Sequence, residues 1–223
     1  ETGGDEVQHL RILGDLEVRP VSDDLRALIG RTKDNVFSKI ETKVENFSDA
    51  ALKDAYLGGL ERGDLTDLRV AKELEQNFSS DAAKGVVSAI KNKAAANFAR
   101  QITEVERVEE RPEILKSFEQ YHDAKSFAVL DEIESLIPED KKGSFDVLKR
   151  KAVDEIRRDI AQVKDVSQEK IVLKSLAGEH PEEFESLAKA ERFIPIDFTS
   201  IFNKIKETQF EKIKDRAGVI TDE

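Results

Sequence analysis

Histidine is the side chain best suited to acid–base or metal chemistry near neutral pH, and the chain has three, at His9, His122 and His180. Asp123 adjoins His122, but no histidine has a second ligand at the spacing that a metal site on one helix requires. His122 and His180 are expected in equivalent turns, where each caps carbonyls of the preceding helix. A shared metal or a pH sensor is the alternative interpretation.

Adjacent acids are the second group that could do chemistry, and they occur at Glu109–Glu110, Glu139–Asp140 and Glu182–Glu183. Glycoside hydrolysis needs two carboxyl groups opposed across a cleft, one with its pKa raised by burial. We expect these acids at helix starts or on polar faces, where the helix dipole and water stabilise their charge. Because no phosphate-binding loop, dinucleotide glycine pattern or calcium loop occurs either, the sequence predicts no enzyme and no cofactor. A cleft with two buried acids would reopen the question.

The composition predicts long helices with acidic surfaces. Of the 223 residues, 39% are hydrophobic and 37% charged, and there are only 11 Gly and 5 Pro. This balance is typical of helices with narrow apolar stripes and wide solvated faces. The net charge of −11 disfavours nucleic acid and anionic membranes as partners, because both require a basic surface.

Several features predict an extracellular or cell-envelope protein. Glu1-Thr2-Gly3 resembles the remnant of a cleaved secretion signal. The chain has no Cys and hence no disulfide, which is more usual inside cells but equally normal in prokaryotic envelope proteins. It has no apolar run long enough to span a membrane. Asn46 and Asn77 each begin a glycosylation sequon that a eukaryotic secretory host could modify.

The elements that would position these residues are amphipathic helices. The longest is expected over 79–110, with Ser79, Ser80 or Asp81 as its N-cap. A second is expected to begin at Ser22. The lead segment before it is predicted to form one turn of helix or a strand-like arm. The apolar stripe of the longest helix follows the helical spacing of three and four: Val86, Ile90, Ala94, Phe98, Ile102, Val105 and Val108.

An internal repeat of about 58 residues connects these helices. At that offset Ile90 matches Leu148, and Ser117 matches Ser175. Each unit is a long, a short and a medium helix, and one unit cannot bury its stripe alone. We therefore expect an all-α elongated array or bundle of tandem repeats. The predicted divisions are a vector remnant and lead segment over 1–20, repeats over 21–79, 80–137 and 138–194, and a partial repeat over 195–223.

The repeat resembles an uncharacterised helical domain of secreted prokaryotic envelope proteins. The resemblance rests on the turn at Gly63-Asp64 and on Ile137-Pro138-Glu139 before a long helix, together with core positions Leu68, Ala71, Leu74, Leu130 and Ile133. It covers about residues 50–215 and implies an envelope location. It implies no catalytic residue.

Two functions are compatible with this sequence. The first is a non-enzymatic spacer, adhesion or protein-interaction module with an unidentified protein partner. The second is a receptor scaffold that holds a peptide, a protein or a small ligand in a groove between repeats. The last helix carries more apolar residues than one face can bury, which predicts a partner-binding stripe at Phe198, Ile201, Phe202, Phe210 and Ile220.

Overall fold

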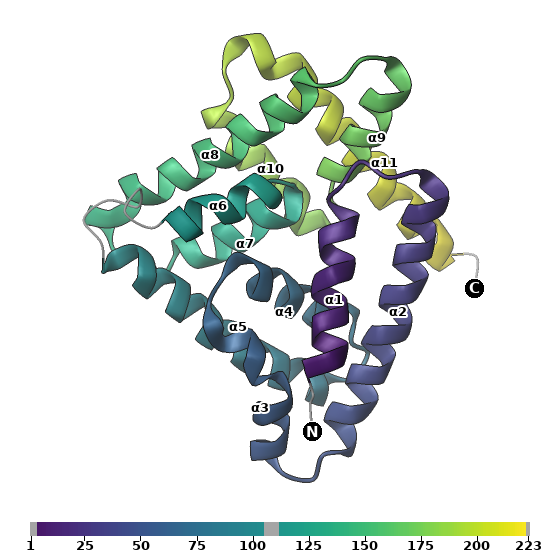
Figure 1. Ribbon diagram of the computed structural model, residues 1–223, viewed down its shortest axis with the longest axis vertical. Coiled ribbons are helices and arrows are strands. Elements are labelled where there is room, and N and C mark those ends of the chain that lie inside the picture. The colour runs from purple at the N-terminus through teal and green to yellow at the C-terminus, as the bar shows by residue number, and fades with distance from the viewer. Residues whose placement is uncertain (1–3, 105–111, 222–223) are drawn as a thin grey trace.

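The computed structural model describes residues 4–104 and 112–221, and every regular element in these ranges is a helix (Figure 1). The predicted all-α fold is therefore confirmed. Residues 1–3, predicted to be a vector remnant, lie outside the described residues.

After the first helix, each long helix is followed by two shorter ones, which we call short and medium by their order in the chain. The long helices are α2 (Asp23–Asn46), α5 (Asp81–Thr103), α8 (Lys142–Ala161) and α11 (Thr199–Thr221). The short and medium helices between them are α3 (Ala50–Leu57) and α4 (Leu65–Asn77), α6 (Pro112–Gln120) and α7 (Ala124–Glu134), and α9 (Val166–Leu176) and α10 (Pro181–Ala190). One long helix followed by two shorter ones agrees with the predicted unit, but α9 is longer than α10, with 11 against 10 residues, so the short–medium order fails in the third unit. The equivalence of the units stays a prediction.

Side-chain caps set where several helices begin. The hydroxyl of Ser22 accepts the backbone N–H of Leu25, and that of Ser80 accepts the N–H of Ala83. Each bond satisfies a donor that has no partner inside its helix. The predicted caps at Ser22 and Ser80 are thus confirmed.

The lead segment differs from its prediction, because it forms a helix, α1 (Gly4–Glu17). Val7 and Leu10 are buried among residues of α2 and α4, so tertiary packing stabilises a helix that the local pattern did not predict. The longest helix also differs, since α5 ends at Thr103, and Val105 and Val108 lie outside the described residues.

The third and fourth long helices begin later than predicted. Pro138 and Pro195 each precede one turn of 3-10 helix, η3 (Glu139–Lys141) and η5 (Ile196–Phe198), and the α-helix starts only after it. Two further 3-10 turns, η1 (Gly58–Arg62) and η4 (Glu191–Phe193), extend α3 and α10.

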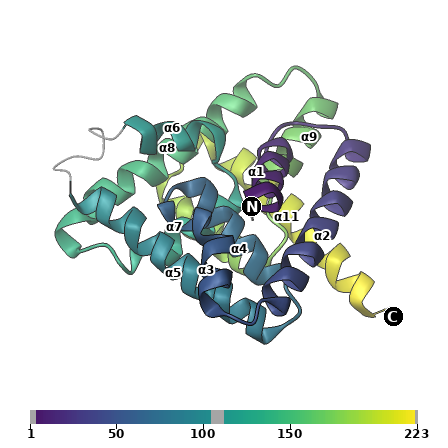
Figure 2. The ribbon, with the colours of Figure 1, turned by 60° about the horizontal axis from the view of Figure 1, so that its bottom comes forward.

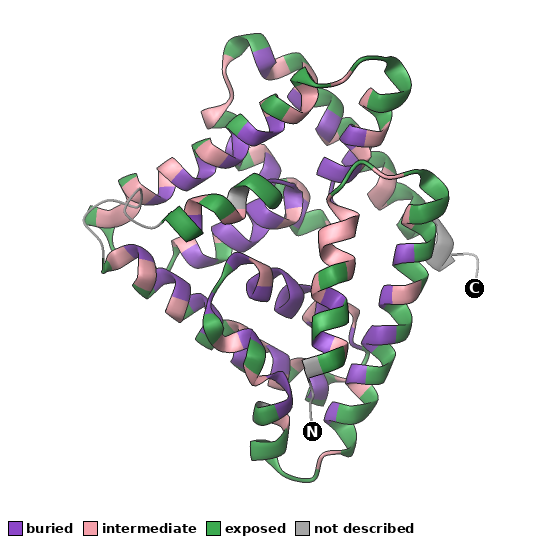
Figure 3. Ribbon diagram, viewed as in Figure 1, coloured by how far each residue is buried: buried purple, intermediate pink, exposed green. Residues whose placement is uncertain are grey.

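The packing follows the helix order. The short and medium helices of each unit contact the long helix of the next: α3 and α4 contact α5, α6 and α7 contact α8, and α9 and α10 contact α11. The medium helices α4, α7 and α10 lie side by side, and Figure 3 shows buried residues concentrated on α4, α7 and the inward faces of the long helices. Each stripe is therefore covered by neighbouring elements, as expected for helices that cannot fold alone.

The array curves back on itself instead of continuing as a straight rod. The ammonium of Lys174 on α9 lies 2.7 Å from both carboxylate oxygens of Asp23 on α2. Figures 1 and 2 both show α11 passing close to α2. The first and last long helices thereby enclose a polar region, described next.

A charged pocket between the first and last long helices

Four helices contribute one charged side chain each to a closed ring of ion pairs. Glu17 ends α1, Lys33 lies on α2, Glu73 on α4 and Lys125 on α7. The Lys33 ammonium lies 2.8 Å from Glu17 Oε2 and 2.6 Å from Glu73 Oε2. The Lys125 ammonium lies 3.1 Å from Glu17 Oε2 and 2.9 Å from Glu73 Oε1. Charges alternate around the ring, so each ion has two opposite neighbours.

The ring is largely shielded from water. The side chains of Lys33 and Glu73 are each 6% exposed, that of Lys125 is 12% exposed and that of Glu17 is 21% exposed. Ions this deeply buried persist only when opposite charges and hydrogen bonds replace the lost hydration. The ring therefore fixes the relative positions of α1, α2, α4 and α7.

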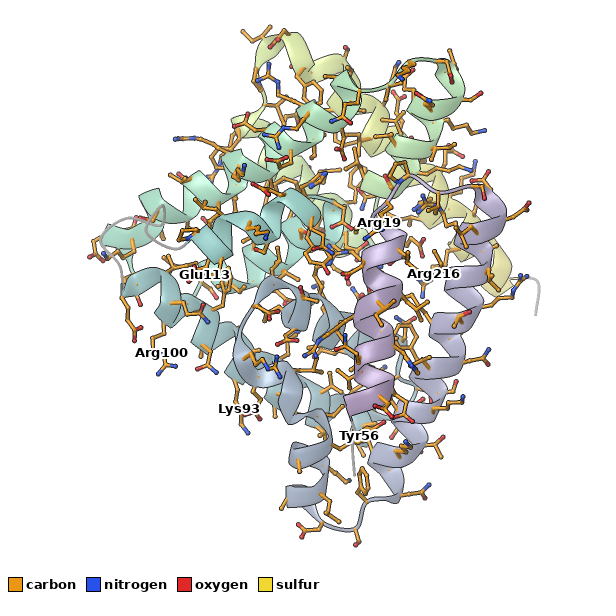
Figure 4. All side chains as sticks on the ribbon, viewed as in Figure 1. Arg19, Tyr56, Lys93, Arg100, Glu113 and Arg216 are labelled. Atoms are coloured by element: carbon orange, nitrogen blue, oxygen red, sulfur yellow. The ribbon has the colours of Figure 1, made fainter. Side chains whose placement is uncertain are left out.

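A pocket of about 470 Å³ opens above this ring. α2, the α9–α10 link and α11 form its walls, and the ring residues line its floor. The charged and titratable groups around its upper part are Asp34, Glu179, His180, Lys212, Asp215 and Arg216. Figure 4 shows Arg216 beside the space between α1 and α2.

The ring keeps its charges at neutral pH. Burial alone would raise the pKa of Glu17, but the charges of Lys125 and Lys33 hold that pKa well below its usual value. The same two lysines overcome burial and lower the pKa of Glu73. Burial would lower the pKa of Lys125, and Glu17 and Glu73 raise it well above its usual value. Neither carboxylate holds a proton that it could donate near pH 7.

The opposite wall is built on α11 and the α9–α10 link. The Lys212 ammonium donates to the carbonyls of Lys174 and Ala177, at 2.9 and 3.0 Å. Burial lowers the pKa of His180, and the nearby Arg216 lowers it further. A neutral His180 therefore accepts from Arg216, whose Nη1 lies 3.2 Å from Nε2 of the imidazole. This contact orients the guanidinium of Arg216.

Glu183 corrects one expectation for the acid pairs, because its side chain is fully buried instead of solvated. As the third residue of α10 it turns back, and its Oε2 accepts the N–H groups of Glu179 and His180 at 2.7 and 3.0 Å. Burial raises its pKa. Glu139 and Asp140 are exposed as expected, and Glu109 and Glu110 lie outside the described residues.

A second buried ion pair joins α4 and α7, the two helices that carry Glu73 and Lys125 of the ring. Arg69 on α4 is 4% exposed and donates to both carboxylate oxygens of Asp123, the N-cap of α7. The same guanidinium donates to the Ser126 hydroxyl at 2.6 Å and lies 4.8 Å from the ring centre of Tyr121. This pair joins α4 to the first turn of α7, from which Lys125 projects into the ring.

The predicted partner-binding stripe does not form one exposed surface. Phe198 in η5 and Phe202 in α11 are buried, and Ile201 packs against the same core, which includes residues of α8, α9 and α10. Phe210 is 58% exposed, and the side chain of Ile220 lies outside the described residues. Most of the described residues of this stripe are therefore packed in the core of the chain itself.

His122 and His180 lie in the α6–α7 and α9–α10 turns, as expected, but their contacts differ from the predicted capping role. His180 is the N-cap of α10, so it precedes a helix instead of ending one. The imidazole of His122 is largely buried, and its Nε2 lies 2.8 Å from Asp159 Oδ2 on α8. Within residues 4–104 and 112–221, no three His, Asp or Glu side chains are placed to hold one metal ion. No helix in these ranges is long and apolar enough to cross a membrane.

The two sequons differ in their surroundings. Asn46 is exposed at the end of α2, whereas Asn77 is half-buried, lines the pocket and donates its amide to the Glu73 carbonyl at 2.8 Å. For protein secreted from a eukaryotic host, we expect a glycan at Asn46 in the folded pool and little or none at Asn77. Glycopeptide mass spectrometry would measure both occupancies. Equal occupancy in a pool with unchanged Tm would contradict this expectation.

Sequence reasoning did not identify the ring, although one signal was present. Lys33 lies four residues after Ile29 and three before Val36, so it occupies a core position of the α2 stripe. A charged residue at a core-facing position of a helix indicates a buried partner of opposite charge. Nothing local identified Glu17, Glu73 and Lys125 as its neighbours, since they come from three other helices.

A comparison of the chain with protein-family models, curated proteins and solved structures finds no match.

Proposed function

We propose that the protein is a non-enzymatic helical binding module whose receptor site is the charged pocket between α2 and α11. The observation that carries the proposal is the closed Glu–Lys ring at the pocket floor. It is rigid and permanently charged, and it faces an upper rim of mixed charge. A site of this kind binds a polar ligand by electrostatic complementarity.

The protonation states of the acids in the ring favour ligand binding over acid–base catalysis. A general acid or base works best when its pKa lies near the working pH. The two acids of the ring, Glu17 and Glu73, instead have lowered pKa values and share two lysines. Two buried acids in a cleft would suggest a hydrolase, but these two are fully compensated.

The charge distribution of the rim supports a small zwitterion, such as a free amino acid or a dipeptide. Lys212 and Arg216 share one acidic neighbour, Glu179, at 3.5 and 3.9 Å, so the two cations retain charge for an anionic group of the ligand. Asp34 and Asp215 are exposed and form no ion pair with any described residue, so they offer a negative wall to its ammonium group. The nearly balanced charge disfavours a simple anion.

The proposal includes an extracellular or envelope location. It also includes a protein partner that presents both an anionic and an ammonium group to the pocket. The folded-back array favours a receptor scaffold over a straight spacer.

The test is thermal unfolding of the intact chain with free amino acids and dipeptides, each added in large excess. A ligand at about 100 times its Kd stabilises by about 2.7 kcal/mol. For a domain of this size that raises Tm by about 5–10 °C. We expect at least one zwitterion to do so.

The matched variants are Arg216→Ala and Arg100→Ala. Arg100 is exposed on α5, and its side-chain contacts with described residues are local, to Asn97 and Glu104. The Tm shift should disappear in Arg216→Ala and persist in Arg100→Ala. A panel without any shift, or a shift that survives Arg216→Ala, would refute the proposal.

A further inference from the structure

A completely buried pair of polar side chains lies where α10 meets α11. Glu183 on α10 and Gln209 on α11 are both 0% exposed. Gly178 in the α9–α10 link lies against both of them: a Cβ atom at this position would overlap Glu183 Oε2 and would lie 2.8 Å from Gln209 Nε2. The carboxyl group and the amide are therefore close neighbours, and we call them the Glu183–Gln209 joint.

The joint is connected to the upper wall of the charged pocket. Glu183 Oε2 accepts the backbone N–H groups of Glu179 and His180, and both of these residues line the pocket. Gln209 lies one helical turn before Lys212, another lining residue, whose ammonium donates to the Ala177 carbonyl at 3.0 Å. The position of the α9–α10 link relative to α11 therefore depends on how Glu183 packs against Gln209.

The hydrogen bonds of the joint are incomplete if Glu183 is ionised. Glu183 Oε1 and both polar atoms of the Gln209 amide have no hydrogen-bond partner among the described residues. Unpaired polar atoms in a protein interior cost free energy, and an unpaired charged oxygen costs more. An ionised carboxylate oxygen and an amide oxygen are both acceptors, so they cannot bond to each other. A proton on Oε1 would make it a donor and would give the amide oxygen a partner.

The electrostatic surroundings favour this proton. Burial is the largest influence on Glu183 and raises its pKa, and the charge of Asp123 raises it further. Lys125 and the two backbone N–H groups at Oε2 lower that pKa. Lys125, however, already pairs with two carboxylates of the ring. Within residues 4–104 and 112–221, no cation forms an ion pair with Glu183. The charged and titratable groups on the neighbouring elements are Asp123 and Lys125 of α7, Glu179 and His180 of the link, and Lys212 of α11.

We propose that Glu183 carries a proton at neutral pH, donates a hydrogen bond through it to the Gln209 amide oxygen, and so fastens the α9–α10 link to α11. Ionisation at higher pH removes the donor and leaves an unpaired carboxylate in the core. The joint then loosens, and with it the upper wall of the pocket. This inference requires no ligand, so it can fail or hold independently of the zwitterion site.

The test is thermal unfolding of Glu183→Gln and wild type between pH 5 and pH 7. The variant keeps an acceptor for the two N–H groups and offers Gln209 a donor that cannot ionise. Folded wild type holds a proton that unfolded Glu, with a pKa of about 4, releases, so wild type loses stability as pH rises. The Tm of Glu183→Gln minus that of wild type should therefore increase by about 3–5 °C per pH unit.

Two matched variants exclude a general effect of removing a carboxylate. Glu185→Gln removes an exposed carboxylate from the same helix and should change Tm little at any of these pH values. Glu73→Gln should be less stable than wild type by a constant amount, because the pKa of Glu73 is lowered and its carboxylate is ionised throughout this range. A constant loss of Tm in Glu183→Gln would show that Glu183 is ionised as well, and would overturn the proposal.

Infrared spectroscopy of the wild type gives a second test that does not depend on that variant. At pH 7 the spectrum should contain the C=O band of a protonated carboxyl group. Gln209→Leu removes the acceptor and should displace this band, because a hydrogen bond to the carboxyl O–H changes its C=O frequency. The absence of any such band in wild type, or a band that Gln209→Leu leaves unchanged, would refute the proposal.

Discussion

Replacing Glu73 with Gln is expected to destabilise the fold by about 3–5 kcal/mol, the usual cost of leaving a buried charge uncompensated. The substitution leaves Lys33 and Lys125 to share the single carboxylate of Glu17. Both lysines are largely buried, so water cannot replace the lost partner. Urea unfolding followed by circular dichroism would measure the change as a lower midpoint at unchanged slope.

Two further variants distinguish disruption of the ring from a general loss of negative charge. Glu207→Gln on the exposed face of α11 removes the same charge and should change stability by less than about 0.5 kcal/mol. Glu73→Gln combined with Lys125→Met leaves the balanced pair Lys33–Glu17, so it should cost less than the sum of the two single changes. A purely additive double variant would show that the ring does not act as a unit.

The same ring gives the stability a defined pH dependence. The folded-state pKa values of Glu17, Glu73 and Asp123 are lowered. Groups of this kind stabilise the fold above the unfolded-state pKa, about 4, and lose that contribution as pH falls through the folded value. Wild type should therefore lose stability steeply below about pH 4, and Glu73→Gln should lose less over that range.

Replacing Asp123 with Ala is the second substitution with a large expected effect, about 4 kcal/mol. It removes the carboxylate that pairs with the buried Arg69 guanidinium. It also removes the N-cap of α7, because Asp123 Oδ1 accepts the Ser126 N–H at 3.1 Å. Thermal and urea unfolding would measure the loss.

Asp165 supplies a close control, because it is the side-chain N-cap of another helix, α9. Its Oδ1 accepts the Gln168 N–H at 2.9 Å, and the side chain is exposed with no arginine against it. Asp165→Ala should therefore cost only about 1 kcal/mol, the value of a cap alone. Equal losses for Asp123→Ala and Asp165→Ala would contradict a stabilising role for the Arg69 pair.

The sequence by itself determined the helical class, several helix starts and the order of long and short helices. These features depend on short-range physics. The stripes of α2 and α5 repeat every three or four residues, and Ser22 and Ser80 are caps that act within one turn. The element with the weakest local pattern, α1, is the one that was predicted wrongly.

Only the tertiary structure decided which faces are covered and which charges meet. Phe198 in η5 and Phe202 in α11 belong to an apolar excess in the sequence, and they are buried because they join a core cluster with residues of α8, α9 and α10. The Glu–Lys ring joins residues from 17 to 125, and its neighbours depend on how four helices cross. Long-range electrostatic pairing has no fixed sequence spacing, so it becomes visible only once the packing is known.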